Sequence, residues 1–489
     1  MRILHIGRDF LALRSCGLTL YSDALMRAQL AGGHQVAYFF AGRHYPKLER
    51  PRLRRWNSDG LPMYELLSTR IHTHWTRGTR HPLHDLADPD AERAFATTLR
   101  ATRPDVVHAH ELSGLPSSIL GQAKAAGAAV VMTLHDYTPL CAAVRLVDLD
   151  GNLCLRRDVG EDCSRNCAAA PDGDAHLVEA TMRYELRRIR EAHPRVAGFA
   201  RERRRAVIRR TLALLGGRPM PAGDVATAET APPTGAPPEH YQRRRETNLE
   251  RLNGCDRLVA PSGRVAEIYA TLGVDPGRIV VQRLTQPHLE SLEPLGGPEP
   301  ADPLTFVTLG SLGTPTKGSE VVLGAVRRLE EAGYGGRYRL RVLGDVAPAL
   351  LQAAEAEPAI ELRGGYYPHE LRERVGDGDV GLVPSVWEEV HGFVGIEMLA
   401  LGMPLIGSAL GGITEYVVEG ETGWLNRSAG AEELAGLMMR LIDDPGEVER
   451  MKRSVRERRD EHVRRMAPHV AEVEALYAEL LAPAAAEAS

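Results

Sequence analysis

The sequence predicts an α/β protein with two lobes, each built around a parallel β-sheet, and three observations support this fold class. The chain has 489 residues, more than a single hydrophobic core usually holds. Near the start of each half, at residues 1–38 and 304–332, a short apolar strand leads through a glycine-bearing turn into a helix. Between the halves, residues 285–303 contain five prolines, which is typical of a linker.

In the first half, apolar runs of strand length alternate with helical patterns, as in a βαβ sheet. Residues 46–88 are rich in Arg, His and Pro without a clear period, and the alternation stops again from Arg156 to Asn253. The expected strands span residues 1–7, 34–38, 104–110, 128–134, 255–262 and 278–284.

The second half repeats the alternation and then becomes helical. Strands are expected at residues 304–310, 359–365 and 380–384, and helices at residues 319–332 and from Phe393 onward. Further helices are expected at residues 431–443, 447–461 and 469–481. The last of these has apolar residues at amphipathic spacing, so one of its faces is expected to pack against the protein.

The most informative stretch runs from Asp379 to Leu425, where a buried strand, a polar loop and a helix start follow one another. The first N–H groups of a helix have no partners inside it, and the helix dipole adds partial positive charge. The helix start at Phe393 therefore suits an anion such as a phosphate. Gly392 lets a ligand approach the backbone closely. Because a phosphate repels carboxylates, the flanking Glu389 and Glu397 are expected to accept hydrogen bonds from sugar hydroxyls.

These residues belong to a longer pattern, which consists of Pro384-Ser385, Glu389, Gly392-Phe393, Glu397, Gly402-Met403-Pro404 and Gly411-Gly412-Ile413-Thr414-Glu415. The pattern resembles the signature of the retaining glycosyltransferases of family 4, which have the GT-B fold of two Rossmann-like lobes facing across a cleft. The resemblance implies that Glu397 binds the ribose of a nucleotide sugar. It also implies that Glu389, a predicted catalytic residue, lies against the transferred sugar and the diphosphate. Gly392, Phe393 and Val394 would contact the donor.

Three other segments complete the predicted site. Lys317 precedes a helix in the second half, where its charge would neutralise part of a diphosphate. His135 follows an expected strand, and the carboxyl ends of parallel strands face the ligand crevice. By resemblance, His135 is the second predicted catalytic residue and contacts the transferred sugar or the acceptor. By the same resemblance, Gly17 approaches the sugar and diphosphate, and Gly364 and Tyr366 flank the nucleotide base.

Two positions depart from the family pattern. Cys16 stands where one glycine of a pair is expected before Gly17, and Ser311 stands where an arginine commonly follows Gly310. A phosphate clamp with two cations is therefore not expected, and Lys317 acts together with the helix-end amides.

The resemblance also divides the chain into parts. An acceptor-side Rossmann-like lobe is expected at residues 1–285, a linker at 286–303, and a nucleotide-sugar-binding lobe at 304–462. Residues 463–489 are expected to form a helix that crosses back to the first lobe.

The implied activity is the transfer of a sugar, of the hexosyltransferase kind, from a nucleoside-diphosphate sugar to an acceptor hydroxyl, with retention of anomeric configuration. No metal or other cofactor is expected in catalysis, and the leaving phosphate is implied to take up the acceptor's proton. The acceptor would be a glycan, a lipid-linked molecule or a small molecule. The alternatives are a sugar-nucleotide epimerase or hydrolase of the same fold, and a nucleotide-sugar-binding protein without transfer activity.

Composition and charge limit the kinds of binding partner that are expected. A net charge of −5 gives no general attraction to nucleic acid. No apolar run reaches the roughly 18 residues of a membrane span, and the first residues lack a signal-peptide core, so a cytoplasmic location is expected. Within the insertion at about 156–253, the arginine-rich stretch from Arg183 to Leu215 has apolar residues at helical spacing. It is interpreted either as a contact with an anionic membrane or a phosphorylated acceptor, or as a solvated basic helix.

Four of the six cysteines, Cys141, Cys154, Cys163 and Cys167, fall within 27 residues. Without a secretory signal, a disulfide framework is not expected. Four thiolates holding a structural zinc ion would explain the cluster, although the spacing contains only one short pair. Reduced thiols in the core or in loops are the alternative.

Overall fold

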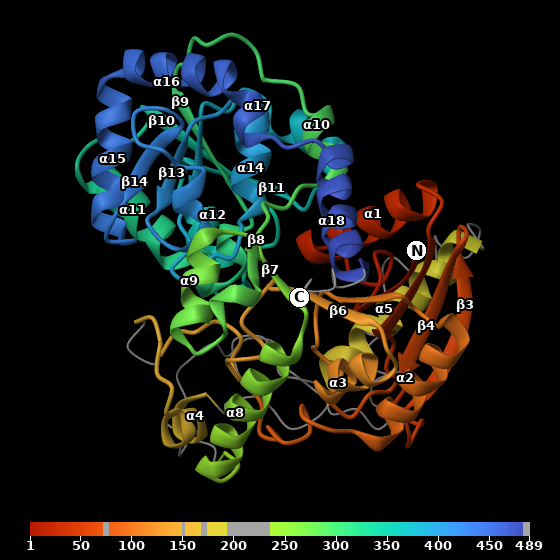
Figure 1. Cartoon of the computed structure of the whole chain (residues 1–489). Coiled ribbons are helices and arrows are strands. Elements are labelled where there is room, and N and C mark those ends of the chain that lie inside the picture. The colour runs from red at the N-terminus through yellow and green to blue at the C-terminus, as the bar shows by residue number, and fades with distance from the viewer. Residues whose placement is uncertain (72–77, 149–151, 168–173, 193–234, 483–489) are drawn as a thin grey trace, which may run out of the picture.

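The computed structural model describes residues 1–71, 78–148, 152–167, 174–192 and 235–482, which form two α/β lobes (Figure 1). Each lobe contains its own sheet, one of eight strands and one of six. The predicted fold class, two Rossmann-like lobes with parallel sheets, is confirmed.

The first sheet has the strand order β3-β4-β2-β1-β5-β6-β7-β8. All neighbouring strands are parallel except β3 and β4, which form an antiparallel hairpin. The strands are β1 (Arg2–Arg8), β2 (Gln35–Ala41), β3 (Arg52–Ser58), β4 (Leu61–Leu67), β5 (Val106–Ala109), β6 (Ala129–Thr133), β7 (Arg257–Ala260) and β8 (Ile279–Val281).

The β3–β4 hairpin lies within residues 46–88, for which no element was predicted. Strand β3 is a largely exposed edge strand rich in arginine, so it lacks the apolar alternation that identifies a buried strand. Its turn is Asp59-Gly60, and both residues have positive φ angles, 48° and 88°. An Asp-Gly pair between two strands is a strong hairpin signal, and it was the available clue.

The second sheet has the order β11-β10-β9-β12-β13-β14 and is parallel throughout. Its strands are β9 (Leu304–Leu309), β10 (Tyr338–Leu343), β11 (Ile360–Gly364), β12 (Val380–Val383), β13 (Leu405–Ser408) and β14 (Gly423–Asn426). In both sheets the chain first builds outward on one side of the starting strand and then returns to its other side. Ligands of open α/β sheets bind at the carboxyl ends of the strands at such a reversal.

Helices cover the sheets and join the strands. In the first lobe they are α1 (Gly17–Ala31), α2 (Pro89–Thr102), α3 (Ser118–Ala125), α4 (Gly160–Asn166), α5 (Ala175–Ala192), α8 (Pro238–Gly254) and α9 (Gly263–Thr271). From the linker onward they are α10 (Pro287–Ser291), α11 (Ser319–Glu331), α12 (Pro348–Ala356), α13 (Leu371–Val375), α14 (Phe393–Ala400), α15 (Ala431–Asp443), α16 (Pro445–Glu457), α17 (Arg459–His462) and α18 (Met466–Leu481).

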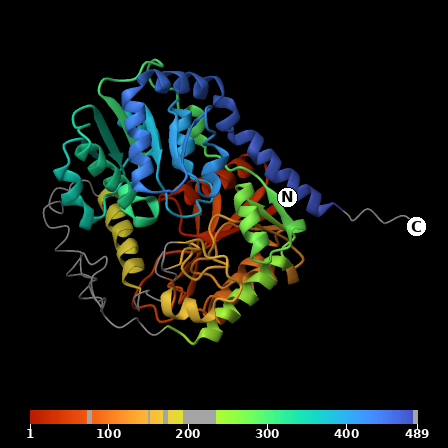
Figure 2. The same ribbon diagram turned by 90° about the vertical axis from the view of Figure 1, so that its left-hand side faces the viewer.

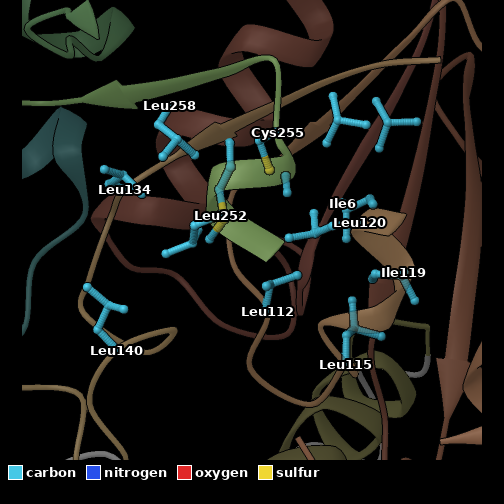
Figure 3. Close-up of a cluster of buried hydrophobic side chains, with 14 of the residues drawn as sticks. Ile6, Leu112, Leu115, Ile119, Leu120, Leu134, Leu140, Leu252, Cys255 and Leu258 are labelled. Carbon is cyan, nitrogen blue, oxygen red and sulfur yellow. The ribbon is translucent and has the colours of Figure 1, made fainter. Parts of the chain in front are cut away.

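The largest apolar cluster of the first lobe packs one face of its sheet against the helices that cover it, because its strand residues alternate along each strand. Leucine and isoleucine side chains from β1, β7, α3 and the connecting loops meet there, and the buried Cys255 packs among them (Figure 3). Of the arginine-rich stretch, α5 contains the beginning, and residues 193–234 lie outside the described residues. No helix in the described ranges is long and apolar enough to cross a membrane.

The proline-rich segment predicted as a linker carries part of the second lobe's core. Leu289, Leu292 and Leu295 are buried in one cluster with side chains of β9, β12 and α14. Leucines three residues apart can fall on one side of the chain, so this segment is anchored in spite of its prolines.

The final helix α18 leaves the second lobe and packs against α1 and β6 of the first (Figure 2). Val473, Leu476 and Tyr477 pack in one apolar cluster with Tyr21 and Leu25. Two buried polar contacts also fix the orientation of α18 on the first lobe. Tyr21 OH lies 2.9 Å from His469 Nε2, and Tyr477 OH lies 2.5 Å from His108 Nδ1. The helix therefore fastens the two lobes together.

A buried ion pair fixes the second lobe at the start of its central strands. Lys452 Nζ on α16 lies 2.9 Å from Asp379 Oδ1, and the side chains are 5% and 1% exposed. Asp379 also accepts hydrogen bonds from the backbone N–H groups of Ala301 and Thr305, at 3.1 and 3.0 Å. This carboxylate thus holds α16, the approach to β9 and the start of β12 in one place.

Lys452→Met is expected to lower the free energy of unfolding by about 3–5 kcal/mol, because the Asp379 carboxylate stays buried without its cation. Denaturant titration followed by circular dichroism measures the change. Arg453→Met is the matched control, since the neighbouring Arg453 side chain is 56% exposed and pairs on the surface with Glu449. Its loss should change stability little. Equal effects of the two substitutions would contradict the role assigned to the buried pair.

Candidate active site

A cavity of about 360 Å³ lies where the two lobes meet. Side chains from the carboxyl ends of both sheets line it, as expected for a ligand site between such sheets. Its walls are formed by Arg14, Cys16, Gly17, Leu18, Glu111, His135, Asp136 and Leu284 from the first lobe, and by Lys317, Trp387, Glu389, Val390, His391, Gly392, Phe393 and Val394 from the second.

The helix start predicted from the sequence is part of this wall. Helix α14 begins at Phe393, and Gly392 before it has a left-handed φ of 72°. A Cβ atom at Gly392 would lie 2.6 Å from Tyr416 OH, so both the conformation and the space favour glycine. Tyr416 OH donates a hydrogen bond to the Gly392 carbonyl at 3.2 Å, which holds the loop. The first amides of α14 therefore meet the cavity in a fixed loop.

The two lobes touch at the beginnings of α1 and α14. The space beside Gly17 is filled by the Phe393 ring, whose Cδ2 lies 3.0 Å from the position of a Cβ at Gly17. Gln286 Nε2 donates to the Gly17 carbonyl at 2.7 Å. Farther along the interface, Tyr137 OH donates to the Glu388 carbonyl at 3.2 Å, and Ser262 Oγ donates to the Val390 carbonyl at 3.0 Å. The loop before α14 is therefore attached to both lobes.

Glu389 is a buried carboxylate at the cavity wall. It accepts hydrogen bonds from Lys317 Nζ and, at 2.8 Å, from Ser385 Oγ. Burial raises its pKa, but Lys317 and the hydrogen bonds from Ser385 and Trp387 outweigh burial and hold the pKa below the ordinary value. Glu389 is therefore ionised at neutral pH and a weak base. Lys317 Nζ also lies 5.7 Å from the centre of the Trp387 ring.

Glu397 lies one turn into α14 in different surroundings. It is 5% exposed and accepts hydrogen bonds from His288 Nε2 at 2.8 Å and from Tyr366 OH at 3.2 Å. Tyr366 and Glu397 thus contact each other, but neither lines the cavity that holds Glu389. Gly364, with a φ of 70°, ends β11 and is also outside its wall.

His135 follows β6 and lines the cavity. Burial lowers its pKa to about 3, with smaller contributions from His391 and His469, so the ring is neutral. Its Nε2 lies 3.4 Å from His110 Nδ1. A buried chain continues behind it, because His110 Nε2 lies 2.9 Å from His5 Nδ1, and His5 Nε2 lies 2.7 Å from Gln29 Oε1. This series of hydrogen-bonded side chains orients the His135 ring.

Among the described residues, one cluster of His, Cys, Asp or Glu has ligand atoms within 4.8 Å of one another, and it consists of His5, His108 and His110. Both ring nitrogens of His5 and of His108 already form hydrogen bonds within the protein. Burial keeps the pKa values of all three rings below the ordinary value. The cluster therefore fits a hydrogen-bonded network rather than a metal centre.

The four cysteines predicted to hold zinc are only partly brought together. Cys163 on α4 shares a hydrogen bond with Cys167, which lowers the pKa of Cys167 to about 7. Cys141 lies close enough to raise the pKa of Cys163, and Cys167 contributes to the raised pKa of Cys141. Cys154 follows a short bridge between Val147 and Leu153. Within the described ranges, the four thiols do not form a cluster at metal-ligand distances. Zinc binding stays a prediction, which elemental analysis of the purified protein tests.

The cavity residues that were not predicted include Arg14, Glu111 and Asp136, which carry acidic or basic side chains. Glu111 comes two residues after β5, and Asp136 comes three residues after β6. The rule that placed His135 at the carboxyl end of a parallel strand applies to both, so their positions carried the signal. Arg14 lies in the loop after β1, where no local pattern marked it.

Two different protein-family models match this chain, one in each lobe. Residues 16–173 match the sequence model of Glycosyltransferase Family 4, and residues 303–444 match that of Glycosyl transferases group 1. Together with the two Rossmann-like lobes, these matches define the class of protein as a glycosyltransferase with the GT-B fold. The chain belongs to glycosyltransferase family 4, as its motif predicted.

Curated relatives match over part of their length. A putative colanic acid biosynthesis glycosyltransferase, WcaL of Escherichia coli, is 33% identical over 144 residues, which are 28% of this chain and 35% of that protein. A D-inositol 3-phosphate glycosyltransferase of Stackebrandtia nassauensis is 31% identical over 219 residues, which are 39% of this chain and 46% of the relative. The chain thus spans between a third and a half of the length of these relatives.

Solved structures match over nearly the whole chain. Sucrose-phosphate synthase from Thermosynechococcus elongatus gives a TM-score of 0.61 at 17% identity and covers 99% of this chain and 100% of its own. HepE of Anabaena, solved in complex with UDP and glucose, gives a TM-score of 0.56 at 11% identity. This match covers 98% of this chain and 99% of the HepE chain. At these identities the likeness shows the fold.

Lys317→Met is expected to destabilise the protein in a pH-dependent way. The folded-state pKa of Glu389 is lowered, so Glu389 contributes stability above the ordinary pKa of a glutamate, and the contribution is lost as pH falls through the folded value. Without Lys317, the effect of burial on the pKa of Glu389 outweighs the remaining hydrogen bonds. The contribution of Glu389 to the stability of the folded state then disappears. The wild-type unfolding midpoint should therefore exceed that of the variant at pH 7, and the gap should close in acid.

Thermal unfolding between pH 3 and 8 measures the gap. Lys317→Arg keeps the charge and serves as the matched control. A gap of the same size at every pH would show that Lys317 does not set the pKa of Glu389.

Proposed function

We propose that the protein is a retaining glycosyltransferase that moves a sugar from a nucleoside-diphosphate sugar to an acceptor hydroxyl. The observation that carries this proposal is the cavity between the lobes, where the start of α14, Lys317 and the buried Glu389 carboxylate meet. These groups supply what a sugar diphosphate needs, namely amides and a cation for the phosphates and a carboxylate for hydroxyls. HepE of Anabaena, which has a similar fold, was solved in complex with UDP-glucose, and this supports a nucleotide sugar as the donor.

The donor lies with its diphosphate at Gly392, Phe393 and Val394 and its sugar toward Glu389 and His135. The ribose lies toward Glu397, where Tyr366 and His288 hold the carboxylate in place. Lys317 is paired with Glu389 in the structure. When the diphosphate arrives, Lys317 is shared between the carboxylate and the phosphates.

Transfer depends on stabilising the charge that develops on the departing diphosphate. Lys317 and the amides at the start of α14 are placed before the reaction, so they stabilise this charge without reorganisation. This arrangement performs the role of a metal ion, and a metal-independent reaction follows from it. The transferred group is a hexosyl residue in this proposal.

Retention requires that the acceptor attacks from the face that the diphosphate leaves, or that a carboxylate of the protein forms an intermediate. Glu389 is held by Lys317 and Ser385, and its lowered pKa makes it a poor nucleophile. Same-face attack is therefore the route proposed, with Glu389 orienting the sugar.

The acceptor occupies the first-lobe half of the cavity and is a glycan, a lipid-linked molecule or a small molecule. Names of relatives point to two of these kinds, a colanic acid glycan and D-inositol 3-phosphate. A cytoplasmic protein that contacts a membrane from its surface fits a lipid-linked acceptor. On α5, Leu186 and Ile189 are 38% and 53% exposed on a helix with several arginines, which supports such a contact.

A nucleotide sugar should raise the thermal unfolding midpoint of the protein, because a ligand that binds only the folded state stabilises it. A panel of UDP-glucose, UDP-galactose, UDP-N-acetylglucosamine, GDP-mannose and ADP-glucose, with the free monosaccharides as controls, identifies the donor. If no member of the panel shifts the midpoint at millimolar concentration, the donor assignment fails.

Glu389→Ala is expected to abolish transfer while the protein stays folded. Removing the carboxylate takes away the group that orients the sugar, and Lys317 can turn toward solvent because it is 37% exposed. Product formation measures the first effect, and circular dichroism the second. Glu330→Ala, in a helix of the same lobe away from the cavity, is the control. Full activity of Glu389→Ala would show the assignment to be wrong, and product formed without any acceptor would favour a hydrolase or epimerase.

A further inference from the structure

We infer that Asp136 is a catalytic residue that binds the attacking hydroxyl of the acceptor and takes up its proton. The inference rests on the proposed function, which it deepens by assigning the proton acceptor on the first lobe's side of the cavity. Asp136 lines the same cavity as Glu389, Lys317 and the start of α14.

The Asp136 backbone is fixed from two sides. Its own carbonyl accepts a hydrogen bond from Tyr269 OH at 2.5 Å, and the next residue, Tyr137, donates through its hydroxyl to the Glu388 carbonyl across the interface at 3.2 Å. Asp136 is therefore held between the first lobe's core and the loop that carries Glu389. This positions the carboxyl group for a ligand between the lobes.

One carboxyl oxygen of Asp136 has no partner. Oδ1 accepts a hydrogen bond from Thr138 N–H at 2.8 Å, whereas Oδ2 is buried and has no hydrogen bond to any described residue. A buried polar atom without a partner costs about 1–3 kcal/mol. Such a cost is explained if the oxygen's partner is a ligand, and a hydroxyl of the acceptor is the ligand that the cavity implies.

The pKa values of the titratable side chains in the cavity also distinguish Asp136 from His135 and Glu389. Burial raises the pKa of Asp136 to about 7, with help from Glu111, while Thr138 and Arg14 oppose the rise. A group that takes a proton during catalysis works best with a pKa near the working pH. The pKa of His135 is about 3 and that of Glu389 is lowered, so both are weaker bases.

The resemblance to family 4 implies that the leaving phosphate takes the proton. In this cavity, Lys317 and the amides of α14 attract negative charge at the phosphate position and so lower the basicity of its oxygens. Asp136, on the opposite lobe, is not subject to this effect through a direct contact. The charged and titratable groups around Asp136 are Glu111, Arg14, Cys16 and His135 in its own lobe, and Lys317, Glu389 and His391 across the cavity.

The step balances in bonds and charge. The acceptor oxygen bonds to the anomeric carbon while the bond from that carbon to the diphosphate oxygen breaks, and the bonding pair leaves on the diphosphate. The acceptor's proton moves to Asp136 Oδ2, so the diphosphate gains the negative charge that Asp136 loses. After the products leave, Asp136 releases the proton to solvent.

Asp136→Asn keeps the shape of the side chain and removes its ability to accept a proton. With the nucleotide sugar that stabilises the wild type best, and a panel of monosaccharides and myo-inositol as acceptor probes, transfer is expected to fall by about 100-fold to 10,000-fold. The donor-induced shift of the unfolding midpoint should not change. Asp256→Asn is the matched control, because Asp256 accepts a hydrogen bond from Val130 N–H at the other end of β6, away from the cavity.

The pH–rate profile of Glu111→Gln is a second measurement. Loss of folding would not produce the shift expected in it. Glu111 raises the pKa of Asp136, so the acid limb of the rate profile, near pH 7 in the wild type, should move to lower pH in this variant. Transfer by Asp136→Asn at more than a third of the wild-type rate, or an acid limb that Glu111→Gln does not move, would overturn the role of Asp136 and leave the proposed function standing. A wild-type protein that binds no nucleotide sugar would overturn both.

Discussion

The site depends on the contact between the beginnings of two helices from different lobes. Helix α1 begins at Gly17 and α14 begins at Phe393, and the Phe393 ring occupies the space that a side chain at position 17 would need. Helix starts have unpaired amides and partial positive charge, and here two of them lie at one cavity. That concentration of donors in a partly closed space suits the diphosphate of the proposed donor.

The carboxyl groups of the cavity differ because their surroundings differ. Glu389 has a cation, a serine hydroxyl and an indole N–H beside it, so it remains charged in spite of burial. Asp136 has a neighbouring carboxylate, and its Oδ2 has no hydrogen-bond partner in the part of the chain that the structure describes, so burial prevails and its pKa rises. Chemically similar side chains can therefore orient a sugar in one place and exchange a proton in another. In the proposed reaction, the second lobe's groups bind the anionic donor, and the first lobe's groups bind the hydroxyl that attacks it.

The lobes are kept in register by buried polar contacts as well as by apolar packing. Helix α18 brings His469 and Tyr477 to Tyr21 and His108 of the first lobe, and buried polar groups of this kind have a low cost only in one arrangement. The chain His5–His110–His135 then extends from that region to the cavity. The packing of the final helix is thus continuous with the wall of the site.

The sequence by itself determined the fold class, the family, and those site residues that sit on a local pattern, namely Glu389 with Gly392 and Phe393, and His135 after its strand. Local patterns suffice there because a strand, a tight turn and a helix start are set by residues close together in the chain. The tertiary structure decided the neighbours. It placed Asp136 beside Glu111, paired Lys317 with Glu389, surrounded Glu397 with His288 and Tyr366, and left the four cysteines without a common centre. The pKa of a buried group depends on residues tens to hundreds of positions away, so folding was needed to distinguish the carboxylate proposed to orient a sugar from the one proposed to accept a proton.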